Sequence, residues 1–290
     1  NRGLLEFSDL LKRPVDTFKY LLGTCENSRI SVGGIIAYLD IVFVGTTNDK
    51  YVHAFTKVPD FPSFKGRTEL IKVPYIRDYR VERRIYDMQV TENVVGRHIA
   101  PHACEMAATW AVLTRLKKPV AERYPETIRG AVGKLTPLEK ADLYALGTHP
   151  AELKPEEAKE LVQHIGELYR ESTDEPEYEG WVGASPREVK GLLLSAAQAT
   201  DVECLHPVRV FEEIGELVKM KNIYEFLQIS SSGEFHDAGL LLKKVEERYA
   251  DIVDREVSAA MGLVTADERA RLLEKDADHA PGSPQDESVL

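Results

Sequence analysis

Several features are scarce in this sequence, and each scarcity excludes a class of protein. The 290 residues include only three cysteines, far apart at Cys25, Cys104 and Cys204, which excludes a disulfide framework and suits reduced thiols. No apolar run is long enough to cross a bilayer. Basic residues are outnumbered, 37 against 48 acids, and the net charge of −11 argues against a dedicated nucleic-acid binder. We therefore expect a cytoplasmic globular protein with neither a membrane nor a nucleic acid as partner.

Common catalytic motifs are also missing. A phosphate-binding P-loop reads G-x-x-x-x-G-K-[ST], but in "GAVGKLT" Ile128 replaces the first glycine and Leu135 follows the lysine, so we interpret this segment as a loop. "GASPR" (183–187) lacks the last glycine of a hydrolase nucleophile elbow, and the marks of eukaryotic protein kinases are absent. These motifs give no direct assignment of function.

A possible metal site deserves separate consideration. The segment "HIAPHAC" offers His98, His102 and Cys104, but Pro101 interrupts any continuous helix that would carry both histidines. A helix entry explains the segment better, and we predict no metal site.

The order of the expected elements divides the chain. "NRGLLEFSDLLKR" at the start has a helical stripe of leucines that Pro14 ends, residues 30–46 indicate two strands around Gly33 and Gly34, and "ELIKVPYI" (69–76) indicates another. Strand patterns then stop. Helical patterns dominate the remainder, over residues 77–90, 101–118, 154–171, 185–200, 207–228 and 236–263. The fold class is therefore α/β followed by all-α, and the acidic, Pro- and Ser-rich residues 266–290 are predicted to be a disordered tail.

Three polar residues follow or open these elements. Asn48 comes directly after the buried strand of "DIVFVGTTND" (40–49), and Arg67 lies on a loop that enters the strand at 69–76. Arg187 lies in the first turn of a helix that Ser185 and Glu188 are expected to cap. The helix dipole disfavours a cation there, unless a bound anion is shared by the guanidinium and the free amide groups. Each signal is weak alone, and a turn or a surface arginine would explain each equally well.

One known architecture uses all three signals in this order. In ATPases of the AAA+ class a strand-end polar residue faces the γ-phosphate, an arginine after the next helix reaches a neighbouring subunit, and an arginine of a helical lid touches the nucleotide. More specifically, the chain resembles the bacterial PrkA family of serine protein kinases over roughly residues 1–265. The resemblance is carried by the segments "NRGLLEFSDLLKRP", "LDIVFVGTTND", "GRTELIKVPYIRDYRVERRIY", "APHACEMAATWAVLTRLKKP", "EGWVGASPREVKGLL" and "HDAGLLLKKVEERYADIVDREV".

The resemblance implies a part of an ATP-dependent serine/threonine protein kinase with an AAA+ core. It implies that Asn48 and Arg187 contact ATP, that Arg67 acts across the interface of a homo-oligomeric ring, and that a protein is the substrate. Gly66 stands where the family has aspartate before the arginine. The family's P-loop and its acidic Walker-B residue precede the segment that "NRG" opens, so we expect a C-terminal fragment that needs residues before Asn1 to hold ATP and Mg²⁺ and is itself inactive.

The resemblance also divides the chain and leaves alternatives open. It implies the C-terminal part of the AAA+ core at 1–95, a helical lid at 96–203 that carries Arg187, and the start of the family's C-terminal part at 204–265. The alternatives are a MoxR-like remodelling ATPase without phosphotransfer, or a non-catalytic helical interaction module. Transfer of phosphate to a protein serine would separate the kinase from the remodelling ATPase, and the lack of a P-loop upstream of Asn1 would favour the interaction module.

Overall fold

The computed structural model describes residues 2–14, 16, 20, 21, 24, 26–171, 173, 175, 177–200 and 203–262. By its internal contacts the chain forms two units, unit 1 over Asn1–Val73 and unit 2 over Pro74–Leu290. The sequence had suggested a division after residue 95. The contacts divide the chain earlier because the helix at residues 79–89 packs against the central helix of unit 2. The expected tail at 266–290 lies outside the described residues.

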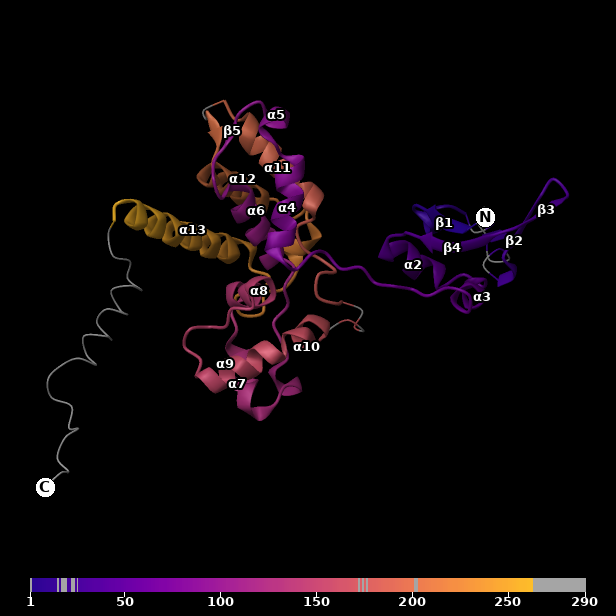
Figure 1. The fold of residues 1–290 in the computed structure, drawn as a ribbon, viewed down its shortest axis with the longest axis horizontal. Coiled ribbons are helices and arrows are strands. Elements are labelled where there is room, and N and C mark those ends of the chain that lie inside the picture. The colour runs from indigo at the N-terminus through magenta and orange to yellow at the C-terminus, as the bar shows by residue number, and fades with distance from the viewer. Residues whose placement is uncertain are drawn as a thin grey trace, which may run out of the picture. The chain divides into compact units, whose positions relative to one another are not determined.

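Unit 1 contains a pair of parallel strands. Strand β1 (Arg2–Phe7) pairs with β4 (Asp40–Gly45), with Phe7 opposite Gly45 at the carboxyl ends (Figure 1). The helix predicted at the start of the chain is therefore wrong. Main-chain pairing with β4 outweighs the leucine periodicity, and only the short 3₁₀ helix η1 (Leu10–Lys12) follows.

Residues 30–46, predicted to form two strands around Gly33 and Gly34, form three, because the segment after Gly34 is divided at Leu39 into a short strand and β4. β2 (Arg29–Val32) and β3 (Ile35–Tyr38) form an antiparallel hairpin whose turn uses both glycines at positive φ, 57° and 84°. Unit 1 also contains the helices α2 (Asp49–Phe55) and α3 (Phe61–Lys65). Their Phe55 and Phe64 pack with Leu10 and Leu21 in a small core.

The strand predicted at 69–76 is not formed. Residues 69–78 have no regular structure, and Ile71 and Val73 are 76% and 82% exposed. Its alternating apolar residues suit a strand, but no described strand pairs with them.

Unit 2 is built around α6 (Ala103–Leu113), in which every residue except Glu105 is buried. A helix without a polar face must be surrounded, and this one is. The helices packed around it in Figure 1 are α4 (Tyr79–Gln89), α11 (Pro186–Gln198), α12 (Pro207–Lys219) and α13 (Ala238–Ala260). The predicted helices at 77–90, 101–118, 185–200, 207–228 and 236–263 are thus confirmed, some of them shorter than expected, and Gly262 follows the last of them with a positive φ of 67°.

A second helical group in unit 2 has its own apolar cluster, which includes Ile128, Leu143 and Leu161. It consists of α7 (Glu126–Lys134), α8 (Pro137–Leu146), α9 (Pro155–Gln163) and α10 (Ile165–Arg170). Two predictions are corrected here. "GAVGKLT" is not a loop, because its first five residues end α7. The helix expected at 154–171 is broken at His164, whose φ and ψ of −91° and 5° are not helical.

Short elements link these helices. They are α5 (Glu92–Val95), η2 (Ala121–Arg123), η3 (Glu225–Gln228) and the two-residue parallel strands β5 (His98–Ile99) and β6 (Cys204–Leu205). The strand pair falls in a region where the sequence indicates only helices, since two residues are too few to show a period.

Candidate functional site at the strand ends and at the start of α11

The carboxyl ends of β1 and β4 are joined by hydrogen bonds. The Thr46 amide donates to the Phe7 carbonyl at 3.0 Å, and the Leu10 amide donates to the Thr46 carbonyl at 2.8 Å. The Asp9 amide also donates to the Thr46 hydroxyl at 3.4 Å. The residues that follow the two strands therefore lie at one edge, the place where α/β proteins bind ligands.

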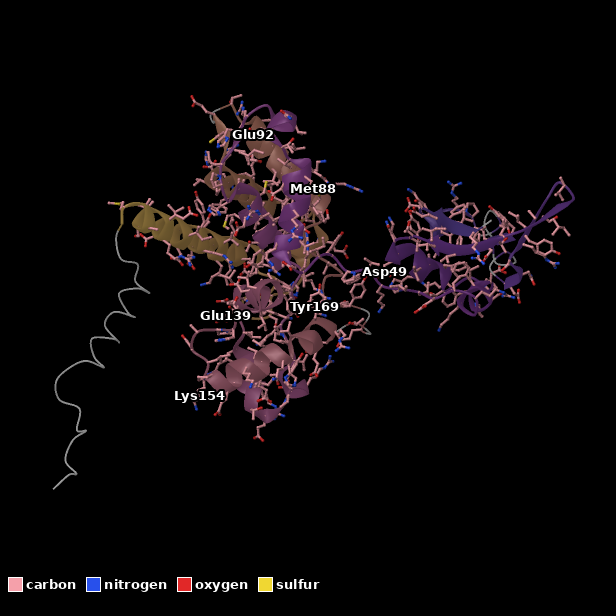
Figure 2. All side chains as sticks on the ribbon, in the orientation of Figure 1. Asp49, Met88, Glu92, Glu139, Lys154 and Tyr169 are labelled. Atoms are coloured by element: carbon pink, nitrogen blue, oxygen red, sulfur yellow. The ribbon has the colours of Figure 1, made fainter. Side chains whose placement is uncertain are left out.

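Asn48 is the N-cap residue of α2, but its side chain does not cap the helix. Its backbone is extended, with φ −87° and ψ 146°, and the side chain makes no capping hydrogen bond. The side chain is exposed, beside Asp49, which opens α2 in Figure 2. Asparagine at an N-cap usually accepts from the first turn. The amide of Asn48 is therefore available for a ligand.

Asp9 lies at the same edge and was missed by the sequence reasoning. It lies two residues after the end of β1, has the left-handed backbone φ of 54°, and exposes its carboxylate, with Lys12 Nζ 3.8 Å away. A non-glycine residue at positive φ is uncommon and is often found at functional sites. The available signal was an acid just after the apolar "RGLLEF", which the helical interpretation of this segment concealed.

The Thr47 hydroxyl is a further polar group beside Asn48. Its Oγ1 is buried and has no hydrogen-bond partner among the described residues. Such an orphan atom is rare in a folded protein and indicates an unmet bonding capacity at this edge.

Arg67 is held by its own unit. Its guanidinium forms an ion pair with Glu26 at 2.9 Å and donates to the Ser63 carbonyl at 2.9 Å, and its side chain is 32% exposed. No described contact joins it to Asn48. To reach a neighbouring subunit, Arg67 would first have to leave Glu26. Its role across a subunit interface therefore stays a prediction.

Arg187 is the second residue of α11, in the capping box predicted from the sequence. The Ser185 hydroxyl accepts from the Glu188 amide at 3.2 Å, and the Glu188 carboxylate accepts from the Ser185 amide at 2.7 Å. Arg187 is exposed and makes no hydrogen bond or ion pair to any described residue. It belongs to unit 2, whereas Asn48 and Arg67 belong to unit 1.

The histidines of "HIAPHAC" lie within hydrogen-bond distance of glutamate side chains. His98 Nδ1 lies 2.6 Å from Glu92, and His102 Nε2 lies 2.9 Å from Glu256. Burial raises the pKa of the Cys104 thiol to about 12, with the nearby Asp87 as a smaller cause, which leaves it unreactive. Within the part of the chain that the structure describes, no three metal-ligating side chains gather.

Comparisons with known proteins identify the family of the chain. The family model of the PrkA AAA domain matches residues 1–122, and that of the PrkA serine protein kinase C-terminal domain matches residues 138–289. A protein of Bacillus subtilis (strain 168) named ATP-dependent protease PrkA is 31% identical over 121 residues. This match covers 41% of the chain and 19% of that protein. No solved structure matches the chain.

These findings define the class and then the family. A parallel strand pair with polar residues at its carboxyl edge, followed by a helical unit, is part of an AAA-type architecture. The chain belongs to the PrkA family. Among the described helices none is both long and apolar enough to span a membrane.

Proposed function

We propose that this chain is part of an ATP-dependent serine/threonine protein kinase of PrkA type. The observation that carries the proposal is the shared edge of β1 and β4, where Asp9 and Asn48 are both exposed next to a buried, unpartnered Thr47 hydroxyl. Strand-end acids and amides are the groups that nucleotide-binding α/β proteins direct at phosphates and metal ions.

The residues at this edge fit one side of ATP with Mg²⁺. Mg²⁺ is usually held by one or two carboxylates together with substrate phosphates, and Asp9 offers one such carboxylate. We assign to Asp9 the acidic role that the resemblance had placed before Asn1. The sequence contains no G-x-x-x-x-G-K-[ST], so the other side of the triphosphate needs a P-loop from outside this sequence.

Each polar residue has a distinct proposed part. Bound ATP supplies the γ-phosphoryl group. The Asn48 amide orients the attacking oxygen, Asp9 would hold Mg²⁺, and Arg187 stabilises the negative charge that develops on the phosphates. Arg67 serves a neighbouring subunit of a homo-oligomer once it is released from Glu26. The protein substrate approaches from outside this chain.

A second candidate function is ATP-dependent proteolysis, favoured by the name of the Bacillus subtilis relative. The experiment incubates the complete gene product with γ-labelled ATP and casein, and measures label on serine or threonine beside casein fragments. Label on intact casein supports the kinase. Fragments without label support the protease, and ATP hydrolysis with neither product supports a remodelling ATPase.

The control for this experiment is the Asn48→Ala variant. It should lose both ATP turnover and whichever product the native protein forms, while keeping its fold, because the exposed side chain makes no described bond. Product formation that survives this change at the native rate would argue against the site.

A further inference from the structure

Unit 2 contains buried charges that its hydrophobic core does not require. The side chains of Arg115 and Glu82 are both 0% exposed and form an ion pair at 2.7 Å. Glu179 is buried as well, and pairs with Arg77 and Lys140. Burying ions is costly, and well-packed apolar residues are often as stable or more so. A buried ion pair is therefore weak evidence that the residues stabilise the fold, and a different role for them has to be considered.

The guanidinium of Arg115 donates hydrogen bonds to three segments of the chain, at Glu82, Ala184 and Ile76. Nη1 and Nη2 donate to the two Glu82 carboxylate oxygens at 3.0 and 2.7 Å. Nε and Nη2 donate to the Ala184 carbonyl at 3.0 and 2.6 Å, and Nη1 donates to the Ile76 carbonyl at 2.8 Å. A guanidinium has five N–H donors, and all five are used. Three of these bonds hold main-chain carbonyls rather than another side chain.

Thr114 holds the other side of the same residue. Its hydroxyl accepts from the Ala184 amide at 2.9 Å and donates to the Ala111 carbonyl at 2.6 Å. The N–H and C=O of Ala184 are thus both fixed by the end of α6. Ala184 directly precedes the N-cap Ser185, and Arg187 is three residues further on.

The preceding glycine shows how close this contact is. Gly183 has φ 140°, and a Cβ there would lie 2.4 Å from the Arg115 Cγ. Only glycine fits at this point. The approach to α11 is therefore set by direct packing on Arg115 as well as by hydrogen bonds.

The segment that enters unit 2 is fastened to the same loop. The Tyr75 amide donates to the Gly180 carbonyl at 2.8 Å, and the Gly180 amide donates to the Arg115 carbonyl at 3.1 Å. Arg77 pairs with Glu179 at 3.1 Å, and its guanidinium lies over the ring of Tyr169, which is labelled in Figure 2. Residues 75–77 and 179–184 form one assembly with the end of α6.

We propose that Thr114 and Arg115 are positioning residues for Arg187. They fix the residue before the N-cap of α11 and, through Ile76, tie it to the segment that follows Val73. The proposal rests on the proposed function, since it gives Arg187 a nucleotide contact to make.

The test is a mutant cycle on the complete gene product, with ATP turnover as readout. Thr114→Val keeps the shape and removes the acceptor of the Ala184 amide, whereas Thr114→Ser keeps the hydroxyl. The matched control is Thr109→Val, at another buried threonine of α6 whose hydroxyl bonds only to the Glu105 carbonyl. We expect Thr114→Val to lower kcat about tenfold or more with little change in KM, because small misplacements of a catalytic group are costly. Thr114→Ser and Thr109→Val should stay close to the native value.

The decisive comparison repeats these changes in the Arg187→Ala background. If Thr114 acts through Arg187, Thr114→Val should cause no further loss there, and a full additional loss would overturn the proposal. If Arg187→Ala leaves ATP turnover unchanged, the proposed function of Arg187 fails, and the positioning role fails with it. An effect of Arg187→Ala without one of Thr114→Val defeats the positioning role alone.

Hydrogen exchange covers the case in which Thr114→Val weakens folding. We expect faster exchange of the amides of residues 184–188 than in Thr114→Ser, with the amides of α12 unchanged. Equal acceleration across all of unit 2 would show a general loss of stability and would contradict a local positioning role.

Discussion

The two units differ in how they bury apolar side chains. The described part of unit 1 has a core of four buried residues, Leu10, Leu21, Phe55 and Phe64, and its strands expose Leu4, Ile35 and Val42 by 68%, 74% and 64%. Unit 2 packs helices around α6 (Figure 1), buries every residue of α6 except Glu105, and also buries ion pairs. The catalytic candidates Asp9 and Asn48 thus lie on a lightly packed sheet, whereas Arg187 lies on a helix with a rigid support. The side chains of unit 2 are therefore held by more extensive packing than those in the described part of unit 1.

The largest expected effect is in unit 2. Glu82→Ala leaves the Arg115 guanidinium buried without its counter-ion, so we expect the free energy of unfolding of unit 2 to fall by about 3–5 kcal/mol. Both tryptophans, Trp110 and Trp181, belong to unit 2, so urea unfolding followed by their fluorescence reports this unit.

The control for this change is Glu216→Ala. It breaks an exposed pair with Lys219, and should change the free energy of unfolding of unit 2 by less than about 1 kcal/mol. Equal effects of the two variants would show that breaking the buried pair destabilises unit 2 no more than breaking an exposed pair.

The next largest effect is a difference in amide hydrogen exchange between the two units. Amides of β1 and β4 should exchange with solvent much faster than amides of α6, because a two-stranded sheet with few buried contacts opens at a lower free energy. Hydrogen exchange followed by mass spectrometry measures this. Protection of β1 equal to that of α6 would remove the contrast.

A third effect separates function from stability in unit 1. Asn48→Ala should lower ATP turnover of the complete gene product about tenfold or more, since a donor directed at developing charge is lost. Its thermal unfolding should not change. The matched control, Asn222→Ala, removes an exposed asparagine of unit 2 and should change neither quantity.

The smallest effect is the pH dependence contributed by His236. Burial lowers its pKa from 6.5, and Lys117 and Lys140 lower it further while Glu179 opposes them. A histidine held neutral contributes stability that is present above pH 6.5 and is lost as the pH falls through the lowered value. The native protein should therefore lose more of its unfolding free energy below pH 6.5 than His236→Asn.

Asparagine is the suitable replacement, because His236 has a φ of 65° that asparagine tolerates. Tryptophan fluorescence follows the unfolding of the two proteins between about pH 7.5 and about pH 5. This interval includes 6.5, the ordinary pKa of histidine. Parallel curves for the two proteins would show that His236 does not titrate with folding.

Local signals predicted the helical half well. The capping box of Ser185 and Glu188, the apolar α6 and the glycine after α13 are encoded within a few residues of one another, so pattern and structure agree. The break at His164 was missed, because a single residue outside the helical region leaves no mark on the apolar period.

Local signals failed where pairing is distant. Whether "RGLLEF" forms a strand depends on β4, nearly forty residues later in the sequence, and the leucine spacing alone favoured a helix. The same error hid Asp9, which is a candidate only because β1 ends beside Thr46.

The sequence by itself determined the family resemblance, the helical character of unit 2 and the choice of Asn48 and Arg187 as candidates, because these depend on residue type and short spacing. Only the tertiary structure placed Asp9 beside Thr46, tied Arg67 to Glu26, and joined Ala184 and Ile76 through Arg115. Contacts between residues far apart in sequence form only when the chain folds, and no local pattern encodes them.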